Sequence, residues 1–154
     1  MTRIKSTGDC VDFDIIPNFN KMTEILHTRG QLERKLSQEI QALYRHHLGH
    51  LPSKVTCQLF DAKLAVIIED SITNAEQILI EEGQNNLAEE VRSSLDKAIQ
   101  PELKQLIETI AEVEILDLLS DATLDTGRTG IIAVLNHTPK VRNPQSVPKA
   151  KHPK

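Results

Sequence analysis

The amino-acid sequence predicts an α+β fold, a two-layer sandwich in which helices lie on one face of an antiparallel sheet. Two observations carry this prediction. Apolar residues recur at helical spacing in three segments, and they recur at a spacing of two in short segments that pair as two hairpins. The resulting order is α-β-β-α-α-β-β, whereas a doubly wound parallel sheet would need strands and helices that alternate one by one.

The first predicted helix carries one apolar stripe and ends near Gly49, with Pro52 just beyond it. The stripe consists of Leu32, Leu36, Ile40 and Leu43. A hairpin follows, because residues 55–60 alternate in polarity, residues 64–69 are rich in β-branched side chains, and a short polar turn separates them.

The second helix is predicted to begin at Thr73, since Thr73 and Glu76 have the spacing of a capping box, and to end near Gly83. A longer helical segment then carries a stripe of Leu87, Val91, Leu95 and Ile99. Pro101 interrupts this segment, and we expect a kink or a restart there before a second stripe over 103–110.

The last hairpin is predicted from alternation over 113–119 and an apolar run over 131–135, joined by a turn over 121–128. One face of its first strand would carry Val113, Ile115 and Leu119, and the opposite face would carry Leu116 and Leu118.

Three regions follow from this pattern: an N-terminal extension over 1–30, an α+β domain over 31–137, and a tail over 138–154. The tail contains four prolines among Lys, Ser, Asn and Gln. Such a composition buries too little apolar surface to offset the entropy of ordering, so we predict that the tail is disordered.

Charge and composition exclude several classes of protein. The net charge is −4, but residues 31–137 hold 9 Lys and Arg against 18 Asp and Glu, while the tail holds five basic residues and no acid. An acidic domain with only 3% aromatic residues makes nucleic-acid binding unexpected. There is no apolar run of the roughly 18 to 20 residues that a membrane span needs, and no signal-peptide core at the start of the sequence. We expect a cytoplasmic protein whose basic tail could bring it to the inner face of the membrane.

A set of short motifs lies in a characteristic order along 31–137: Leu48-Gly49-His50-Leu51-Pro52, Ile72-Thr73-Asn74-Ala75-Glu76 with Leu79, Val91-Arg92, Pro101-Glu102-Leu103, Ser120-Asp121 and Thr126-Gly127. This order resembles the bacterial MpsC-like family. The resemblance implies the α+β fold and, through the family name, a link to a sodium-translocating, membrane-potential-generating system. In that family the first helix is usually followed by Gly-Arg-Gly-Pro or Gly-Lys-Gly-Pro, whereas this chain has His50 and Leu51 at the second and third positions.

Three histidines at the end of the first helix, His46, His47 and His50, form the candidate metal site. Two imidazoles four residues apart can hold Zn²⁺ or Ni²⁺ if the helix continues past Gly49. Two other interpretations stay open: the imidazoles solvate the carbonyls at the helix end, or they sense pH or bind a ligand.

A candidate ligand pocket combines the loop over 49–52, including His50, with Arg92 and Thr73, and would take an anion. The alternative for Arg92 is an ion pair with a neighbouring glutamate such as Glu89 on a solvated helix face. We interpret Cys57 as a small core residue, with a redox or metal role as the alternative.

No catalytic constellation is evident, because adjacent carboxylates such as Glu81 and Glu82 diverge around a helix and no nucleophile or phosphate-binding motif occurs. We therefore predict no enzymatic activity and no cofactor. The first functional hypothesis is a non-enzymatic oligomeric binding or regulatory module, most simply a dimer. The alternatives are an accessory subunit of a membrane ion or bicarbonate transport system, and a metal protein or enzyme that uses the three histidines.

Overall fold

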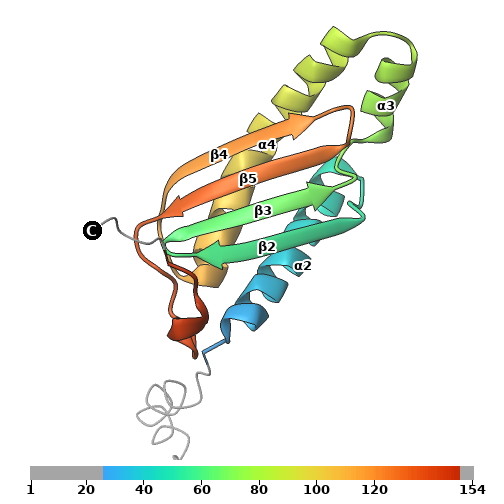
Figure 1. Cartoon of the computed structure of the whole chain (residues 1–154). Helices are drawn as coiled ribbons and strands as arrows, with labels where there is room; N and C mark the ends of the chain where they lie inside the picture. The colour runs from blue at the N-terminus through green and yellow to red at the C-terminus, as the bar shows by residue number, and fades with distance from the viewer. Residues whose placement is uncertain (1–25, 150–154) are drawn as a thin grey trace, which may run out of the picture.

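The computed structural model describes residues 26–149 and contains helices and strands in the predicted order (Figure 1). The helices are α2 (Arg29–Leu48), α3 (Asn74–Glu81) and α4 (Asn85–Ala111); the strands are β2 (Lys54–Phe60), β3 (Lys63–Glu69), β4 (Ile115–Thr123) and β5 (Arg128–Leu135). A short 3-10 helix, η1 (Pro144–Ser146), comes last. The predicted α+β fold and element order are confirmed. Most of the predicted N-terminal extension, including Cys10, lies outside the described residues.

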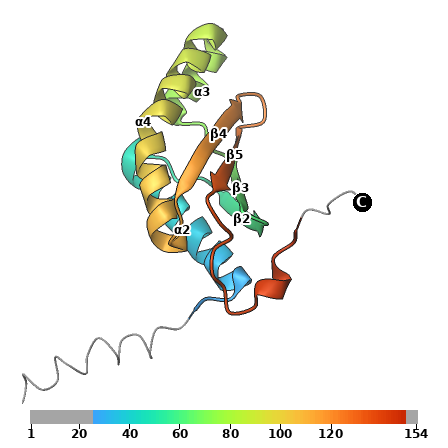
Figure 2. The ribbon, with the colours of Figure 1, turned by 90° about the vertical axis from the view of Figure 1, so that its left-hand side faces the viewer.

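The four strands form one antiparallel sheet in the order β2-β3-β5-β4. The two hairpins therefore meet at β3 and β5 in the middle, and β2 and β4 form the edges. Helices α2 and α4 pack on one side of the sheet, and no helix among residues 26–149 covers the other side (Figure 2). The helices thus lie on one face, as the sequence predicted.

The core lies between the helices and the sheet. The stripe predicted on α2 is confirmed at Leu32, Leu36 and Ile40, which are buried, and Leu43 packs at the margin of the core. The inward faces of the strands contribute Cys57, Leu59, Leu64, Val66, Ile68, Ile131 and Ala133. This arrangement follows from period-two alternation on strands and near-four spacing on helices.

Both α2 and α3 begin with capping boxes. The Thr28 hydroxyl accepts a hydrogen bond from Gln31 N, and the Thr73 hydroxyl accepts one from Glu76 N, with the reciprocal side-chain bonds in place. Helix α2 ends at Gly49, whose φ of 66° provides the left-handed C-terminal geometry. The predicted start of α3 and end of α2 are confirmed.

Helix α4 does not restart at Pro101 but runs through it as one helix. Ile99, Leu103 and Ile107 form a continuous buried stripe on both sides of the proline. Burial of this stripe against the core compensates for the backbone hydrogen bond that proline cannot donate.

The predicted faces of the first strand of the second hairpin are confirmed for Ile115 and Leu116 and wrong for Leu118 and Leu119. A β-bulge shifts the register between Ile115 and Asp117, so that Leu118 packs against the core and Leu119 is 54% exposed. One inserted residue reverses the direction of every later side chain on the strand. The strand also continues to Thr123, which shortens the turn to residues 124–127.

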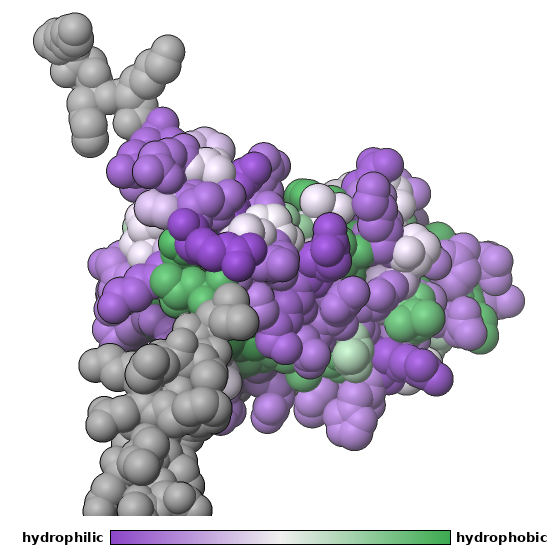
Figure 3. Space-filling model, turned by 90° about the horizontal axis from the view of Figure 1, so that it is seen from below, coloured by the Kyte–Doolittle hydropathy of each residue, from purple (hydrophilic) through white to green (hydrophobic). Residues whose placement is uncertain are grey.

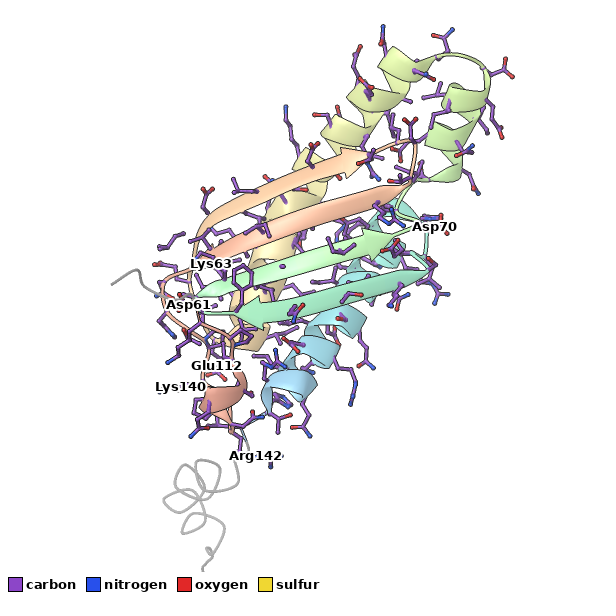
Figure 4. The ribbon with its side chains drawn as sticks, viewed as in Figure 1. Asp61, Lys63, Asp70, Glu112, Lys140 and Arg142 are labelled. Atoms are coloured by element: carbon purple, nitrogen blue, oxygen red, sulfur yellow. The ribbon has the colours of Figure 1, made fainter. Side chains whose placement is uncertain are left out.

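The prediction of disorder from residue 138 onward is wrong for residues 138–149, which we call the strap. Val141 and Val147 of the strap are buried in the core cluster. The strap's backbone is also tied down, because Arg142 N donates to His27 O and Asp61 N donates to Pro148 O. Figure 4 places Lys140 and Arg142 at the same end of the molecule as Asp61, with Asp70 at the opposite end.

None of the helices within residues 26–149 combines the length and the apolar composition that crossing a bilayer requires.

Candidate functional site

A buried arginine occupies the centre of the most polar part of the interior. Arg92 lies on the inward side of α4, and its side chain is 4% exposed. Its Nη1 donates a 2.9 Å hydrogen bond to Ser71 O, and its Nε lies 3.2 Å from Glu76 Oε2 and 3.6 Å from Asp96 Oδ1. The alternative of a solvated pair with Glu89 is wrong, because two other carboxylates hold Arg92 inside the protein.

The first half of α4 faces the interior one residue away from the predicted stripe. Ala88 and Arg92 are buried, whereas Leu87 is 44% exposed and Val91 is half-buried. The ion pairs of Arg92 fix this rotation, since turning Leu87 inward would take the guanidinium away from its carboxylates.

Glu76 joins the start of α3 to Arg92. Its Oε1 accepts hydrogen bonds from the Thr73 amide (3.1 Å) and hydroxyl (2.7 Å), while its Oε2 faces Arg92 Nε. The side chain is fully buried. The predicted capping role of Glu76 is confirmed, and the same carboxylate has a second role as the partner of a buried cation.

The loop before α3 is also fixed to the β4–β5 hairpin. Ser71 Oγ lies 2.8 Å from Thr129 Oγ1 and donates a 3.0 Å hydrogen bond to Gly127 O. Gly127 adopts a φ of 72° in this turn, which a residue with a side chain adopts only with strain. The carbonyl of Ser71, which receives Arg92, is therefore held in place from two sides.

The polar network is incompletely satisfied. Glu76 Oε2, Arg92 Nε, Arg92 Nη2 and Asp96 Oδ1 are buried atoms that make no hydrogen bond within residues 26–149. Three of these atoms, Glu76 Oε2, Arg92 Nε and Asp96 Oδ1, still make ion-pair contacts at 3.2–3.6 Å. Native interiors rarely leave such atoms unpaired, and each one found calls for an explanation.

A groove of about 510 Å³ opens beside this network, between α4 and β4. Arg92 and Asp96 line it from the helix, and the segment 120–125 lines it from the strand and the turn. The two residues of the network that line the groove, Arg92 and Asp96, hold their incompletely satisfied atoms buried behind its wall.

Asp96 is the group whose ionisation this environment perturbs most clearly within the groove. Burial raises the pKa of its carboxyl above the ordinary 3.8; Arg92 lowers it, and Glu76 and Asp121 raise it further. Burial likewise raises the pKa of the Tyr44 hydroxyl, whose surroundings include the charges of Asp96 and Arg92. Desolvation outweighs the attraction of the nearby guanidinium for Asp96.

We expect the Asp96→Asn variant to become more stable relative to the wild type as the pH rises. A native pKa above the unfolded value means that the native state holds the proton more tightly, so stability present at low pH is lost as pH rises through the native pKa. The free-energy difference between variant and wild type should grow above about pH 4, the ordinary value for Asp, and then level off. Urea unfolding across a pH series measures it.

The control for this titration is Ser93→Ala, at an exposed position of the same groove that carries no titratable side chain. This variant should show no growing difference from the wild type. A constant or shrinking difference for Asp96→Asn would contradict the assigned direction.

The predicted residues His50 and Thr73 lie together in a second hollow, of about 400 Å³, while Arg92 lines the first groove instead. His50 Nε2 lies 2.7 Å from Asp70 O and 3.9 Å from Asp70 Oδ1. The structure thus brings two of the three predicted ligand-binding residues together, and it places Arg92 beside the carboxylates of Glu76 and Asp96.

The three predicted metal ligands lie at the end of α2. The rings of His46 and His47 meet edge to face with centroids 5.0 Å apart, and His50 contacts Asp70. In the part of the chain that the structure describes, no three His, Cys, Asp or Glu side chains form a group that could hold a metal ion. A metal role for these histidines stays a prediction.

Cys57 occupies the inward side of β2 and is 6% exposed. Burial raises the pKa of its thiol to about 11, with smaller effects from Ser37 and Glu33. A thiol with this pKa is mostly protonated at neutral pH and is a poor nucleophile.

Sequence reasoning missed Asp96 as a member of the polar network. The available signal was the arginine itself, because Arg92 stands four residues after Ala88 and four before Asp96 on one helix. A charged pair at that spacing next to an apolar stripe indicates a guanidinium at the edge of a core.

The side of the sheet away from the helices, which we call the open face, is apolar in its middle. Its apolar centre consists of Ala65, Ile67, Leu119, Ile132 and Val134. Ala65 pairs with Ile132 across β3 and β5, and Ile132 pairs with Leu119 across β5 and β4. Ile67 is 41% exposed and Leu119 is 54% exposed.

Comparison with known proteins gives one match. The model of the family described as "Na+-translocating membrane potential-generating system (MpsC)" matches residues 28–137. No curated protein and no solved structure matches the chain. The matched range starts at the capping residue of α2 and ends just after β5, so it includes every element of the sandwich.

Proposed function

The chain belongs to the MpsC family, and we propose that it is a non-enzymatic binding module that pairs with a second copy through its open face. Within the membrane-potential-generating system that the family description names, it would be an accessory subunit. The observation that carries the proposal is the open face itself, a sheet surface with exposed apolar side chains and no helix over it among residues 26–149.

The apolar centre is suited to burial against another protein surface. Its members lie on the three neighbouring strands β3, β5 and β4, so they form one patch instead of isolated apolar residues. Contiguous apolar patches mark interaction sites more often than scattered apolar residues do.

Charges on the two sides of the apolar centre favour a second copy as the occupant. Lys54 on β2 and Lys63 on β3 give one side a positive charge, and Asp117 on β4 gives the other side a negative charge. Glu69 and Arg128 on the two middle strands form an ion pair with each other at 2.7 Å. A two-fold axis parallel to the strands would lay the basic side of one copy over the acidic side of the other. An axis across the strands would instead place like charges together. A symmetric interface must be self-complementary, and the first arrangement meets that requirement.

Charge reversal tests this arrangement. We expect the wild-type chain to form dimers in sedimentation equilibrium, and Lys63→Glu or Asp117→Lys alone to weaken the dimer at least tenfold. The double variant Lys63→Glu/Asp117→Lys restores opposite charges across the two-fold axis, so it should regain most of the wild-type affinity. High salt should weaken the wild-type dimer, because exposed charges are screened.

The matched control is Glu102→Lys/Lys104→Glu, a reversal of two exposed charges on α4, on the helix side of the protein. It should leave the dimer unchanged. A monodisperse wild-type monomer at tens of micromolar would overturn the proposal, and so would a dimer that withstands both single reversals on the sheet.

An accessory role at the inner face of the membrane draws support from the strap. Lys140, Arg142 and Lys149 lie on it, and residues 138–149 contain no acid. Figure 3 shows this end of the molecule, whose surface is mainly hydrophilic with smaller hydrophobic patches. Positive charge without a broad apolar surface suits electrostatic attachment to anionic headgroups or to an acidic partner.

A further inference from the structure

We propose that the groove between α4 and β4 binds a small amphoteric solute that combines a carboxylate with ammonium groups and carries a net positive charge, as a basic amino acid does. This inference concerns a small ligand on the helix side of the sheet. It is independent of the self-association proposed for the open face.

The first argument is that one donor and one acceptor at the wall of the groove are buried without a hydrogen-bond partner among the described residues. Arg92 Nη2 can donate a hydrogen bond and Asp96 Oδ1 can accept one, and neither has a hydrogen-bond partner within the described residues. Both residues line the groove. A buried polar atom without a partner is costly to the protein, so a solute that supplies both partners forms hydrogen bonds that the protein alone leaves unmade.

The second argument is that Arg92 is held in a fixed position. Its Nη1 is bound to Ser71 O, its Nε faces Glu76, and the side chain is 4% exposed. A guanidinium that is already ordered loses little further entropy when it binds a carboxylate. The groove thus presents a preorganised donor beside a carboxylate acceptor.

The third argument is charge. The groove carries more acids than bases, with Glu89, Asp96, Asp121 and Asp125 against Arg92 and Lys97. This field disfavours phosphates and dicarboxylates. A bare metal ion is also disfavoured, because the Arg92 guanidinium lies 3.6 Å from the Asp96 carboxylate that would have to bind it. A solute with a net positive charge is attracted by the excess of acids in the groove. An oxygen acceptor on the same solute would give Arg92 Nη2 the hydrogen-bond partner that it lacks.

The volume agrees with this class of ligand. A groove of about 510 Å³ is within the range of about 300–1,000 Å³ that small-molecule sites occupy. One end of such a solute would place its carboxylate at Arg92 Nη2 after the side chains that cover this buried atom move aside. Its ammonium groups would lie against Asp96 and the acids of segment 120–125.

Three probes separate the contributions, each titrated into the ¹⁵N-labelled full chain and followed by NMR. L-Lysine carries the full set of groups, putrescine has the ammonium groups without an oxygen acceptor, and L-glutamate has the carboxylate with the opposite net charge. We expect saturable shifts with L-lysine at amides of residues 89–100 and 120–125, and at least tenfold weaker binding of the other two probes.

Two variants complete the test. Asp96→Asn should weaken L-lysine binding at least tenfold, and its spectrum reports whether the variant is folded. Glu102→Gln, an exposed position on the same helix outside the groove, should leave binding unchanged. Absence of saturation by L-lysine up to about 10 mM, which corresponds to less than roughly 3 kcal/mol of binding free energy, would overturn the proposal. Equal binding of L-lysine and putrescine would also overturn it, since Arg92 would then contribute nothing.

Discussion

Replacing Arg92 by methionine is expected to lower the free energy of unfolding by about 3–5 kcal/mol. Methionine keeps an unbranched stem similar to the aliphatic part of arginine but removes the cation that faces Glu76 and Asp96. Glu76 is fully buried, so its carboxylate would then lie in the interior without a positive partner. Losing one member of a buried pair costs far more than the pair itself contributes, because the remaining charge keeps its full desolvation penalty. Urea unfolding followed by circular dichroism measures the difference.

The double variant Arg92→Met/Glu76→Gln separates the ion pair from packing. Glutamine keeps an oxygen for the Thr73 cap but removes the charge, so the double variant should be destabilised by less than the sum of the two single variants. Arg45→Met, at an exposed position of α2, is the surface control and should change stability by no more than about 0.5 kcal/mol. A loss below about 1 kcal/mol in Arg92→Met would show that water already screens the pair.

The polar network also shows which parts of this fold the sequence can predict. Helix α2 was predicted closely because Leu32, Leu36 and Ile40 are apolar and the positions between them are mostly polar. The first half of α4 offers two competing faces, one with Leu87 and the other with Ala88 and Arg92. The choice depends on carboxylates that only the tertiary fold brings to Arg92, so a periodicity argument cannot make it.

The second hairpin was placed correctly but its side chains were not. A β-bulge inserts one residue without any change in composition, and neither Gly nor Pro marks the step from Ile115 to Asp117. Alternation therefore predicted the existence of the strand and, beyond Ile115, assigned Leu118 and Leu119 to the wrong faces. The exposed position of Leu119 in turn contributes to the apolar centre of the open face.

The candidate site was anticipated in single residues and not as an assembly. Arg92, Thr73 and His50 were all singled out, but the structure divides them between two hollows separated by the Glu76–Arg92 pair. Spacing along a chain predicts neighbours on one helix or in one loop. It does not predict which side of α4 each loop reaches, because that depends on how α3 folds back against α4.

The strap leads to the second large effect: Val141→Ala together with Val147→Ala should lower the free energy of unfolding by about 4–5 kcal/mol. Each valine loses two buried carbon atoms, at about 0.8 kcal/mol per methylene, and leaves a cavity that adds to the cost. Both side chains are buried in the core cluster. Thermal and urea unfolding of the full chain, with each single variant alongside, measure the effect and its additivity.

Val134→Ala is the matched control, because the same substitution at a half-buried position of the open face should cost clearly less than either strap variant. If the double strap variant is as stable as the wild type, the strap is not part of the folded core in solution. Composition alone favoured that outcome, since the strap is rich in proline and lysine. Burial of Val141 and Val147 offsets the entropy of ordering the strap. Backbone hydrogen bonds to His27 and Asp61 also hold the strap in place. A short polar segment can therefore be ordered when a preformed core offers its few apolar side chains a place and its backbone a partner at either end.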